Sequence, residues 1–127
     1  MSSFSNYLVN KLLDHVFNGV AYTPPSAVYL ALYTVAPTDA GGGTEVSGAG
    51  YARLEVDFTA AASQAIENSA DLTFTASGGN FGEVVAVGIF DALTGGNLLS
   101  WDEITPATIN DTDDLNFPAG DIDQTLD

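Results

Sequence analysis

From Val28 onward, apolar and polar residues alternate with a period of two, and this pattern is what most limits the folds open to the chain. A period of two places successive side chains on opposite faces of a β-strand. The preceding Pro24-Pro25 cannot lie in a helix interior, so the pattern begins after a break. The clearest strand is predicted over residues 51–58. Its expected inward residues are Ala52, Leu54, Val56 and Phe58, and its expected outward residues are Arg53, Glu55 and Asp57.

Residues 84–90 are apolar at nearly every position, which predicts a strand covered on both faces at the centre of the sheet. Turn residues over 91–96 predict a hairpin with a strand at 97–101. Further strands are predicted at 28–33, 70–75, 115–117 and 122–126. Together they indicate a mainly β fold, an antiparallel β-sandwich or jelly-roll-like barrel over residues 28–127. The glycine-rich segment 36–50 is predicted to be a surface loop of this unit.

An N-terminal amphipathic α-helix is predicted over residues 4–18, because apolar residues recur there at three- and four-residue spacing. Ser3 or Ser5 is the expected N-cap, and Asn18-Gly19 the expected end. The apolar face is wide and must lie against something. Two alternatives are open: the sheet of its own domain, or a neighbouring subunit. The apolar residues are Phe4, Tyr7, Leu8, Leu12, Leu13, Val16 and Phe17.

The length of 127 residues with 46% apolar residues fits a single domain over 1–127. The lack of cysteine removes disulfides and thiolate chemistry. The first ten residues lack the basic and apolar regions of a signal peptide, and no apolar run reaches the ~20 residues of a membrane span. We therefore expect synthesis in the cytoplasm and no membrane association.

Charge is distributed very unevenly between the signs: 17 Asp and Glu stand against only Lys11 and Arg53, for a net charge of −15. Nucleic acids and anionic membranes are bound by rows of Lys and Arg, so neither is an expected partner. Two interpretations of the acid surplus stay open. It gives solubility alone, or it is an adaptation to a saline medium that screens the repulsion between carboxylates.

Residues for catalysis are scarce. The single histidine, His15, follows Asp14 on a helix where neighbours point about 100° apart, so the two cannot form a Ser-His-Asp relay. Lys11, the only lysine, is expected on a solvated helix face, and no glycine-rich phosphate loop precedes a helix. Carboxylate pairs suffice for glycoside hydrolysis, but with 17 carboxylates no pair stands out. We expect a protein that is not an enzyme and has no cofactor.

The acidic segment 110–114 is the one candidate metal site, with Asp111, Asp113 and Asp114 as candidate oxygen ligands for calcium. A helix-loop-helix calcium site would need glycine at its sixth position and glutamate at its twelfth. Leu115 and Asp121 stand there if the loop begins at Asn110. The alternative is a solvated turn between strands.

Several sequence blocks together resemble a group of small tailed-phage virion proteins commonly labelled tail fibre proteins, which are similar to small β proteins that act as capsid cement. The blocks are Phe4-Ser5-Asn6-Tyr7-Leu8, residues 11–17, Tyr22-Thr23-Pro24-Pro25, residues 28–34, Glu45-Val46-Ser47-Gly48, Gly50-Tyr51-Ala52-Arg53 and residues 88–99. The acid surplus departs from the group and fits a virus of a saline host. The resemblance implies a virion structural protein made in the host cytoplasm.

We expect a capsid decoration protein on the capsid surface, because a long fibre needs repeats or coiled coils and a cement protein needs a small rigid body. Its implied partners are the major capsid protein and further copies of itself, as a homo-oligomer such as a trimer. The alternative is a tail fibre or tail-tip module whose aromatic residues stack on host sugars. The aromatic residues are Tyr22, Tyr29, Tyr33, Tyr51 and Trp101.

Candidate contact residues are Phe4, Tyr7, Leu8 and Arg53, together with the loop 36–50. For Arg53 two interpretations are open. Its guanidinium forms a bidentate pair with a carboxylate of a neighbouring strand or subunit, or it is a surface charge that balances Glu55 or Asp57. Trp101 is similarly open to a role in sheet packing or in sugar stacking.

Overall fold

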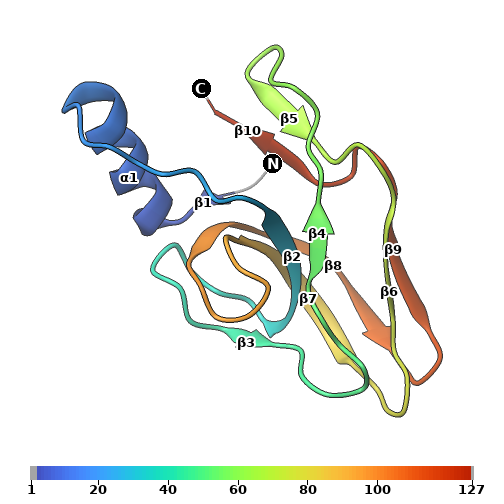
Figure 1. The fold of residues 1–127 in the computed structure, drawn as a ribbon. Helices are drawn as coiled ribbons and strands as arrows, with labels where there is room; N and C mark the ends of the chain where they lie inside the picture. The colour runs from blue at the N-terminus through green and yellow to red at the C-terminus, as the bar shows by residue number, and fades with distance from the viewer. Residues whose placement is uncertain (1–2, 127) are drawn as a thin grey trace.

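The computed structural model describes residues 3–126, and it confirms a mainly β fold with one N-terminal helix (Figure 1). In chain order the elements are β1 (Ser3–Phe4), α1 (Asn6–Phe17), β2 (Val28–Val35), β3 (Thr44–Glu45), β4 (Leu54–Val56), β5 (Ala65–Glu67), β6 (Leu72–Thr75), β7 (Gly82–Phe90), β8 (Leu98–Ile109), β9 (Asp114–Phe117) and β10 (Asp123–Thr125).

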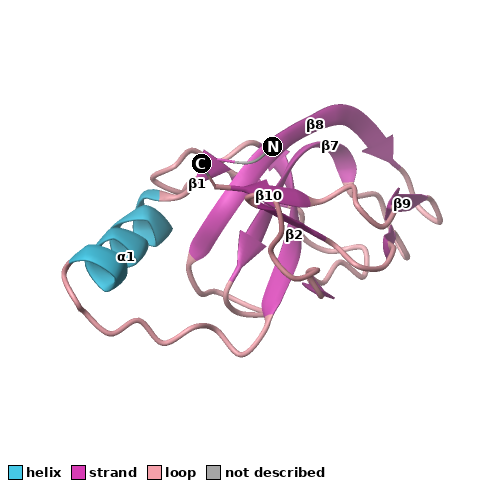
Figure 2. Ribbon diagram, turned by 90° about the horizontal axis from the view of Figure 1, so that it is seen from above, coloured by secondary structure: helices cyan, strands magenta, loops and turns pink. Residues whose placement is uncertain are grey.

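The strands form one large antiparallel sheet and two small ladders. The six-stranded sheet has the order β1-β8-β7-β2-β3, and β4 also pairs with β2. The small ladders are β5 with β10 and β6 with β9. Figures 1 and 2 show the ladders beside one face of the large sheet. The described strands make a sandwich-like arrangement that does not close into a barrel, so the sandwich form of the prediction is the one adopted.

The main core lies between the large sheet and the ladders. Leu30, Leu32 and Val84 of the sheet are fully buried against Phe74 and Phe117 of the β6–β9 ladder. A smaller cluster covers the opposite face of the sheet. It contains Ala31, Tyr33, Ala86 and Phe90. Strands β2 and β7 are therefore covered on both faces, which confirms the predicted central position of residues 84–90.

The β7–β8 hairpin confirms the turn predicted over 91–96, but β8 continues to Ile109, well beyond the predicted 97–101. The prediction stopped early because the second half of β8 is polar and contains Pro106. The structure accommodates this proline at an irregularity: Ala86 pairs with Glu103 and Val84 with Ala107, so the register shifts around Pro106. A bulge is where a strand tolerates a missing backbone donor.

Three segments differ from their predicted extents. The strand expected over 51–58 is only Leu54–Val56, with Ala52 exposed instead of buried. The segment 36–50 is not only a loop, because it contains β3 and the buried Val46. The helix begins at Asn6, not at residue 4, because Phe4 pairs with Ser100 in the sheet. No helix in the described part of the chain has the length and apolar character needed to cross a membrane.

Candidate functional site

The start of α1 is tied to the sheet by its N-cap. Ser5 is buried, and its Oγ accepts from Leu8 N at 3.2 Å and donates to Leu98 O at 2.5 Å, which confirms Ser5 as one of the two predicted caps. The backbone N–H of Asn6 donates to Asp39 O at 2.8 Å. These bonds link the first turn to β8 and to the segment 36–50. Tyr7 and Leu8 add packing against the main core.

The rest of α1 projects from the protein. No residue of α1 is buried, and the helix stands to one side of the sheet in Figures 1 and 2. We call the exposed apolar residues at this end the α1 face. They are Val9, Leu13, Val16, Phe17 and Val20, with exposed fractions of 39, 50, 65, 78 and 52%. Packing on the protein's own sheet, one of the two alternatives for the helix, therefore holds only for its first turns.

The predicted contact residues of this region lie elsewhere on the helix. Phe4, Tyr7 and Leu8 are half-buried, and Tyr7 and Leu8 attach α1 to its own domain. Their role in binding a partner stays a prediction. The helical spacing identified the apolar residues correctly, but it did not separate those that attach the helix from those that are left exposed.

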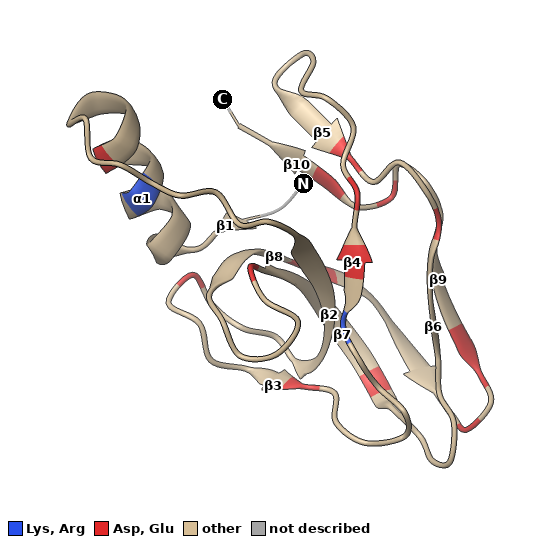
Figure 3. Ribbon diagram, in the orientation of Figure 1, with Lys and Arg blue, Asp and Glu red and all other residues tan. Residues whose placement is uncertain are grey.

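Charged side chains are rare in the same part of the chain that carries most of the exposed apolar residues. Within residues 3–38 the only charged side chains besides the titratable His15 are Lys11 and Asp14, while every other carboxylate follows from Asp39 onward. Figure 3 shows the acidic segments spread over the sandwich and its loops. Arg53 is buried, so Lys11 is the one exposed Lys or Arg in the described residues. The α1 face thus lies in a long segment of an acidic chain, residues 3–38, in which the charges of Lys11 and Asp14 balance.

Arg53 is enclosed inside the protein. Its Nε and Nη2 donate to the two carboxylate oxygens of Glu45 at 2.9 Å each, and Nη1 donates to Ala92 O and Gly95 O at 2.8 Å. The guanidinium carbon lies 3.7 Å from the centre of the Phe90 ring. Arg53 therefore joins β3, the segment leading to β4 and the 91–96 turn. The predicted bidentate pair is the correct interpretation, and the outward orientation predicted for this residue is wrong.

The hydrogen bonds around Arg53 stabilise its positive charge and the negative charge of Glu45. Burial raises the pKa of Glu45, but hydrogen bonds from Arg53 and Tyr51 and the nearby positive charge outweigh it, so the pKa lies below its usual range. Burial raises the pKa of Tyr33 to about 12. The hydroxyl of Tyr51 donates to Glu45 Oε2 at 2.6 Å and accepts from Leu32 N at 3.0 Å. This cluster is a structural crosslink that faces the interior.

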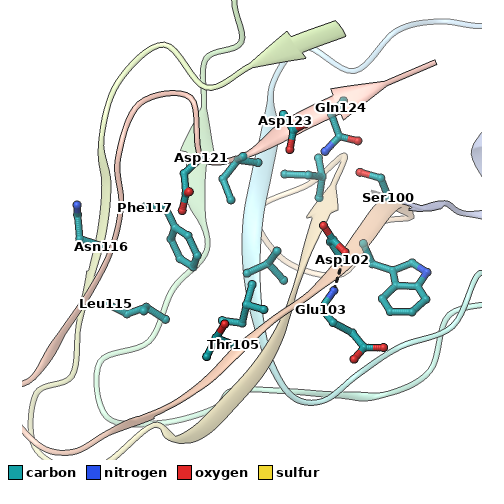
Figure 4. Close-up of a pocket in the computed structure, with 15 residues that line it drawn as sticks. Ser100, Asp102, Glu103, Thr105, Leu115, Asn116, Phe117, Asp121, Asp123 and Gln124 are labelled. Carbon is teal, nitrogen blue, oxygen red and sulfur yellow. Dashed lines mark hydrogen bonds between the residues drawn. The ribbon is translucent and has the colours of Figure 1, made fainter. Parts of the chain in front are cut away.

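A cleft of about 410 Å³ opens between β8 and the β9–β10 region (Figure 4). We call it the β8–β10 cleft. Its apolar lining is Val87, Ile89, Ile104, Leu115, Phe117 and Ile122. Its acidic lining is Asp102, Glu103, Asp121 and Asp123. Asp102 pairs with Val87 and lies on the cleft side of β8, whereas Glu103 pairs with Ala86 of the cluster on the opposite face, and its side chain points away from Asp121 and Asp123 in Figure 4. The cleft therefore has an apolar floor and an acidic edge formed by Asp102, Asp121 and Asp123.

Trp101 lies at the end of this cleft and is half-buried. Its Nε1 donates to Asp39 Oδ1 at 2.8 Å, and the same oxygen accepts from Ser3 Oγ at 2.6 Å. The hydrogen bonds from Ser3 and Trp101 lower the pKa of Asp39. Of the tyrosines proposed beside Trp101 for sugar stacking, Tyr33 and Tyr51 pack within the two cores. A role for Tyr22 and Tyr29 in sugar stacking stays a prediction.

The acidic segment 110–114 forms a hydrogen-bonded turn. Asp111 Oδ1 accepts from Gly78 N at 3.0 Å, Asp113 Oδ2 from Asn110 N at 2.9 Å, and Asp114 Oδ1 from Thr75 Oγ1 at 2.6 Å. Within residues 3–126 no three His, Cys, Asp or Glu side chains are grouped so that they would hold a metal ion. The arrangement favours the solvated turn, one of the two alternatives for this segment.

His15, the only histidine, is exposed near the end of α1, with Nδ1 2.9 Å from Val20 O. Lys11 Nζ lies 5.7 Å from the centre of the Tyr7 ring. Neither residue lines the β8–β10 cleft. The described residues therefore offer surfaces for binding, while the two side chains considered for catalysis lie on the projecting helix.

Fold and surfaces together define a small sandwich-like β protein with an anchored, projecting helix and an acidic cleft. Residues 3–125, nearly the whole chain, match the family described as Podophage GP4 fiber I protein gp80, and the chain belongs to this family. It is therefore a phage virion structural protein of a fibre-protein family, as the sequence blocks predicted. A search of curated proteins finds no significant match.

Sequence reasoning missed one buried polar residue of structural importance. Asn68 is 2% exposed; its Nδ2 donates to Ala70 O and Pro118 O, and its Oδ1 accepts from Ile122 N. This single side chain ties the β5–β6 connection to the turn between β9 and β10. The one signal in the sequence is that Asn68 lies between two predicted strands. An exposed turn residue would lie in the same position, so the sequence does not indicate that Asn68 is buried.

Proposed function

We propose that this protein is a structural binding module of the phage fibre and that it acts through its surfaces, without catalysing a reaction. The observation that carries the proposal is the α1 face, which the chain leaves exposed beside an otherwise acidic surface. Soluble proteins rarely leave a large apolar patch uncovered unless another molecule covers it. The fibre name of the matched family supports this location over the head.

A second candidate function is capsid decoration, in which the partner is the major capsid protein and the protein lies on the capsid surface. It is favoured by the shape of the described residues, which form one short sandwich-like body with no shaft. A cement protein of this kind binds through many weak contacts whose combined affinity is high. Its location and its copy number differ from those of a fibre module.

The test is to locate the protein in purified virions. Gold-labelled antibodies and quantitative mass spectrometry, referenced to the major capsid protein, would give its position and its copies per particle. A small number of copies on fibres supports the fibre module, and copies in the hundreds over the head support capsid decoration. Absence from the assembled particle overturns both. Hydrolysis of host glycans by the purified protein would overturn the proposal of a non-catalytic module.

A further inference from the structure

We propose that the α1 faces of two copies pack against each other, antiparallel, around a two-fold axis beside Leu13. The inference rests on the proposed role of this face as a binding surface and names a second copy of the chain as its partner. It is tested on the isolated protein, whereas the proposed function is tested in virions, so the two can fail separately.

The four residues of the α1 face that belong to the helix form one stripe. Successive residues of an α-helix are rotated by about 100°, so Val9, Leu13, Val16 and Phe17 lie within about 100° of one another around the helix axis. Their exposed fractions rise from 39% at Val9 to 78% at Phe17. By the same rotation Lys11 lies on the opposite side of the helix. The contact that this stripe can make is therefore apolar and does not involve an ion pair.

The stripe is complementary to itself when two helices meet antiparallel. Leu13 lies midway between Val9 and Phe17, four residues from each. An antiparallel pair centred at Leu13 places this leucine against its own copy, and it places Val9 of each helix opposite Phe17 of the other. A small side chain opposite a large one lets the two rows interdigitate. A surface with this symmetry forms a closed contact between identical copies, which is the commonest form of protein dimer.

Charge favours the antiparallel arrangement over the parallel one. Lys11 and Asp14 balance, so the net charge of −15 belongs to the rest of the chain. The helix is anchored to the sandwich only at its start, where Ser5 Oγ donates to Leu98 O, and Figure 2 shows it projecting from there. A parallel pair would bring two acidic sandwiches side by side. An antiparallel pair places them at opposite ends of a 12-residue helix, about 18 Å in length, which exceeds the screening length of ~10 Å at 0.1 M salt.

The size of the stripe indicates a weak contact. Four partly exposed side chains in each copy bury less than the ~1,200 Å² at which interfaces of standard size begin. We therefore expect a dissociation constant in the micromolar to millimolar range. Copies of a virion structural protein are held close together on one particle, and weak contacts between neighbours then act at a high effective concentration. A second copy is the partner for which such a small contact suffices.

The first experiment uses disulfide crosslinking, since the chain contains no cysteine. A cysteine beside a two-fold axis meets the same cysteine of the second copy at a distance that a disulfide can span. Leu13→Cys is therefore compared with Leu93→Cys in a glutathione redox buffer. Leu93 is the matched control because it is a leucine with 51% exposure, against 50% for Leu13, on another surface. A mixture of Val9→Cys with Phe17→Cys, compared with each variant alone, reports the direction of the helices.

The second experiment is sedimentation velocity up to ~1 mM protein, which covers the expected range of affinity. The wild type is compared with Leu13→Glu, which would bring two carboxylates together at the axis, and with Leu93→Glu, which adds the same charge elsewhere. Circular dichroism checks that each variant keeps its helix. We expect the wild type and Leu93→Glu to dimerise alike, and Leu13→Glu to raise the dissociation constant at least about tenfold.

In the crosslinking experiment we expect Leu13→Cys to dimerise at least about tenfold faster than Leu93→Cys, and the mixture of Val9→Cys with Phe17→Cys to crosslink faster than either variant alone. Three results overturn the inference. They are a monomeric wild type at every concentration, equal crosslinking at positions 13 and 93, and crosslinking of Val9→Cys alone that is faster than in the mixture. The last of these would indicate a parallel pair.

Discussion

Replacement of Arg53 by methionine is expected to lower the free energy of unfolding by about 3 kcal/mol. Methionine keeps an unbranched chain against the Phe90 ring but removes the charge and every hydrogen bond that Arg53 donates. Each hydrogen bond to a charged group contributes about 1.5–3 kcal/mol, and the values do not add when the groups share one side chain.

The magnitude depends on what is left behind. Breaking a fully buried ion pair by removing one partner costs about 3–5 kcal/mol, because the remaining charge is unpaired. The side chain of Glu45 is 27% exposed and keeps its bond from Tyr51, so water and one hydroxyl still reach it. These two facts place the effect at the lower end of the range. In Glu45→Gln/Arg53→Met no buried charge remains, so the coupling energy of the double-mutant cycle is expected near 1.5–2 kcal/mol.

The assay is urea unfolding followed by circular dichroism, at a fixed salt concentration for all variants. Lys11→Met is the matched control, since it removes the other basic side chain of the chain at an exposed site and is expected to change stability by less than about 0.5 kcal/mol. A loss for Arg53→Met below 1 kcal/mol, or one equal to that of the control, would show that the buried crosslink does not stabilise the fold.

Three further predictions concern stability and its dependence on solvent. Asn68→Ala should lower the free energy of unfolding by about 2–3 kcal/mol in the same urea assay, because it leaves buried backbone groups without partners. The depressed pKa of Glu45 means that its pairing contributes stability above its unfolded pKa of about 4.3. That contribution is lost as the pH falls through the lower folded value, so the stability difference between wild type and Glu45→Gln should shrink from pH 5 to pH 3. The melting temperature should rise from dilute buffer to 1 M NaCl, where the screening length falls to ~3 Å, and a flat calorimetric response would leave the charge of −15 with a role in solubility alone.

The elements set by local pattern were predictable from the sequence. Segment 84–90 is apolar at nearly every position and rich in Val and Ile, which favours a strand covered on both faces, so its central place was predictable. The hairpin after it followed from the turn residues Asp91 to Gly96. The polar half of β8 was not predictable in this way, because its pairing depends on β7 and not on its own composition.

The inward orientation of Arg53 depends on which strands become neighbours. A period of two assigns Arg53 to the solvent face, and nothing local contradicts this. The residue turns inward because β3 and β4 both pair with β2, which brings Glu45 within reach of its guanidinium. The acceptors Ala92 O and Gly95 O are backbone atoms of a distant turn, and backbone acceptors leave no mark in a sequence.

The segregation of charge limits where a second copy of so acidic a chain could make contact. Two bodies that carry −15 each repel one another wherever carboxylates meet, and screening beyond ~10 Å at 0.1 M salt relieves only the more distant pairs. The close contact itself must therefore involve a surface without excess negative charge. Residues 3–38 provide such a surface, since they hold one Lys and one Asp, and α1 carries it outward from the acidic sandwich on a helix fixed by Ser5. The helix α1 thus combines exposed apolar side chains, little net charge and a position that projects from the sandwich. A helix that served only to cover its own sheet would need none of these three properties.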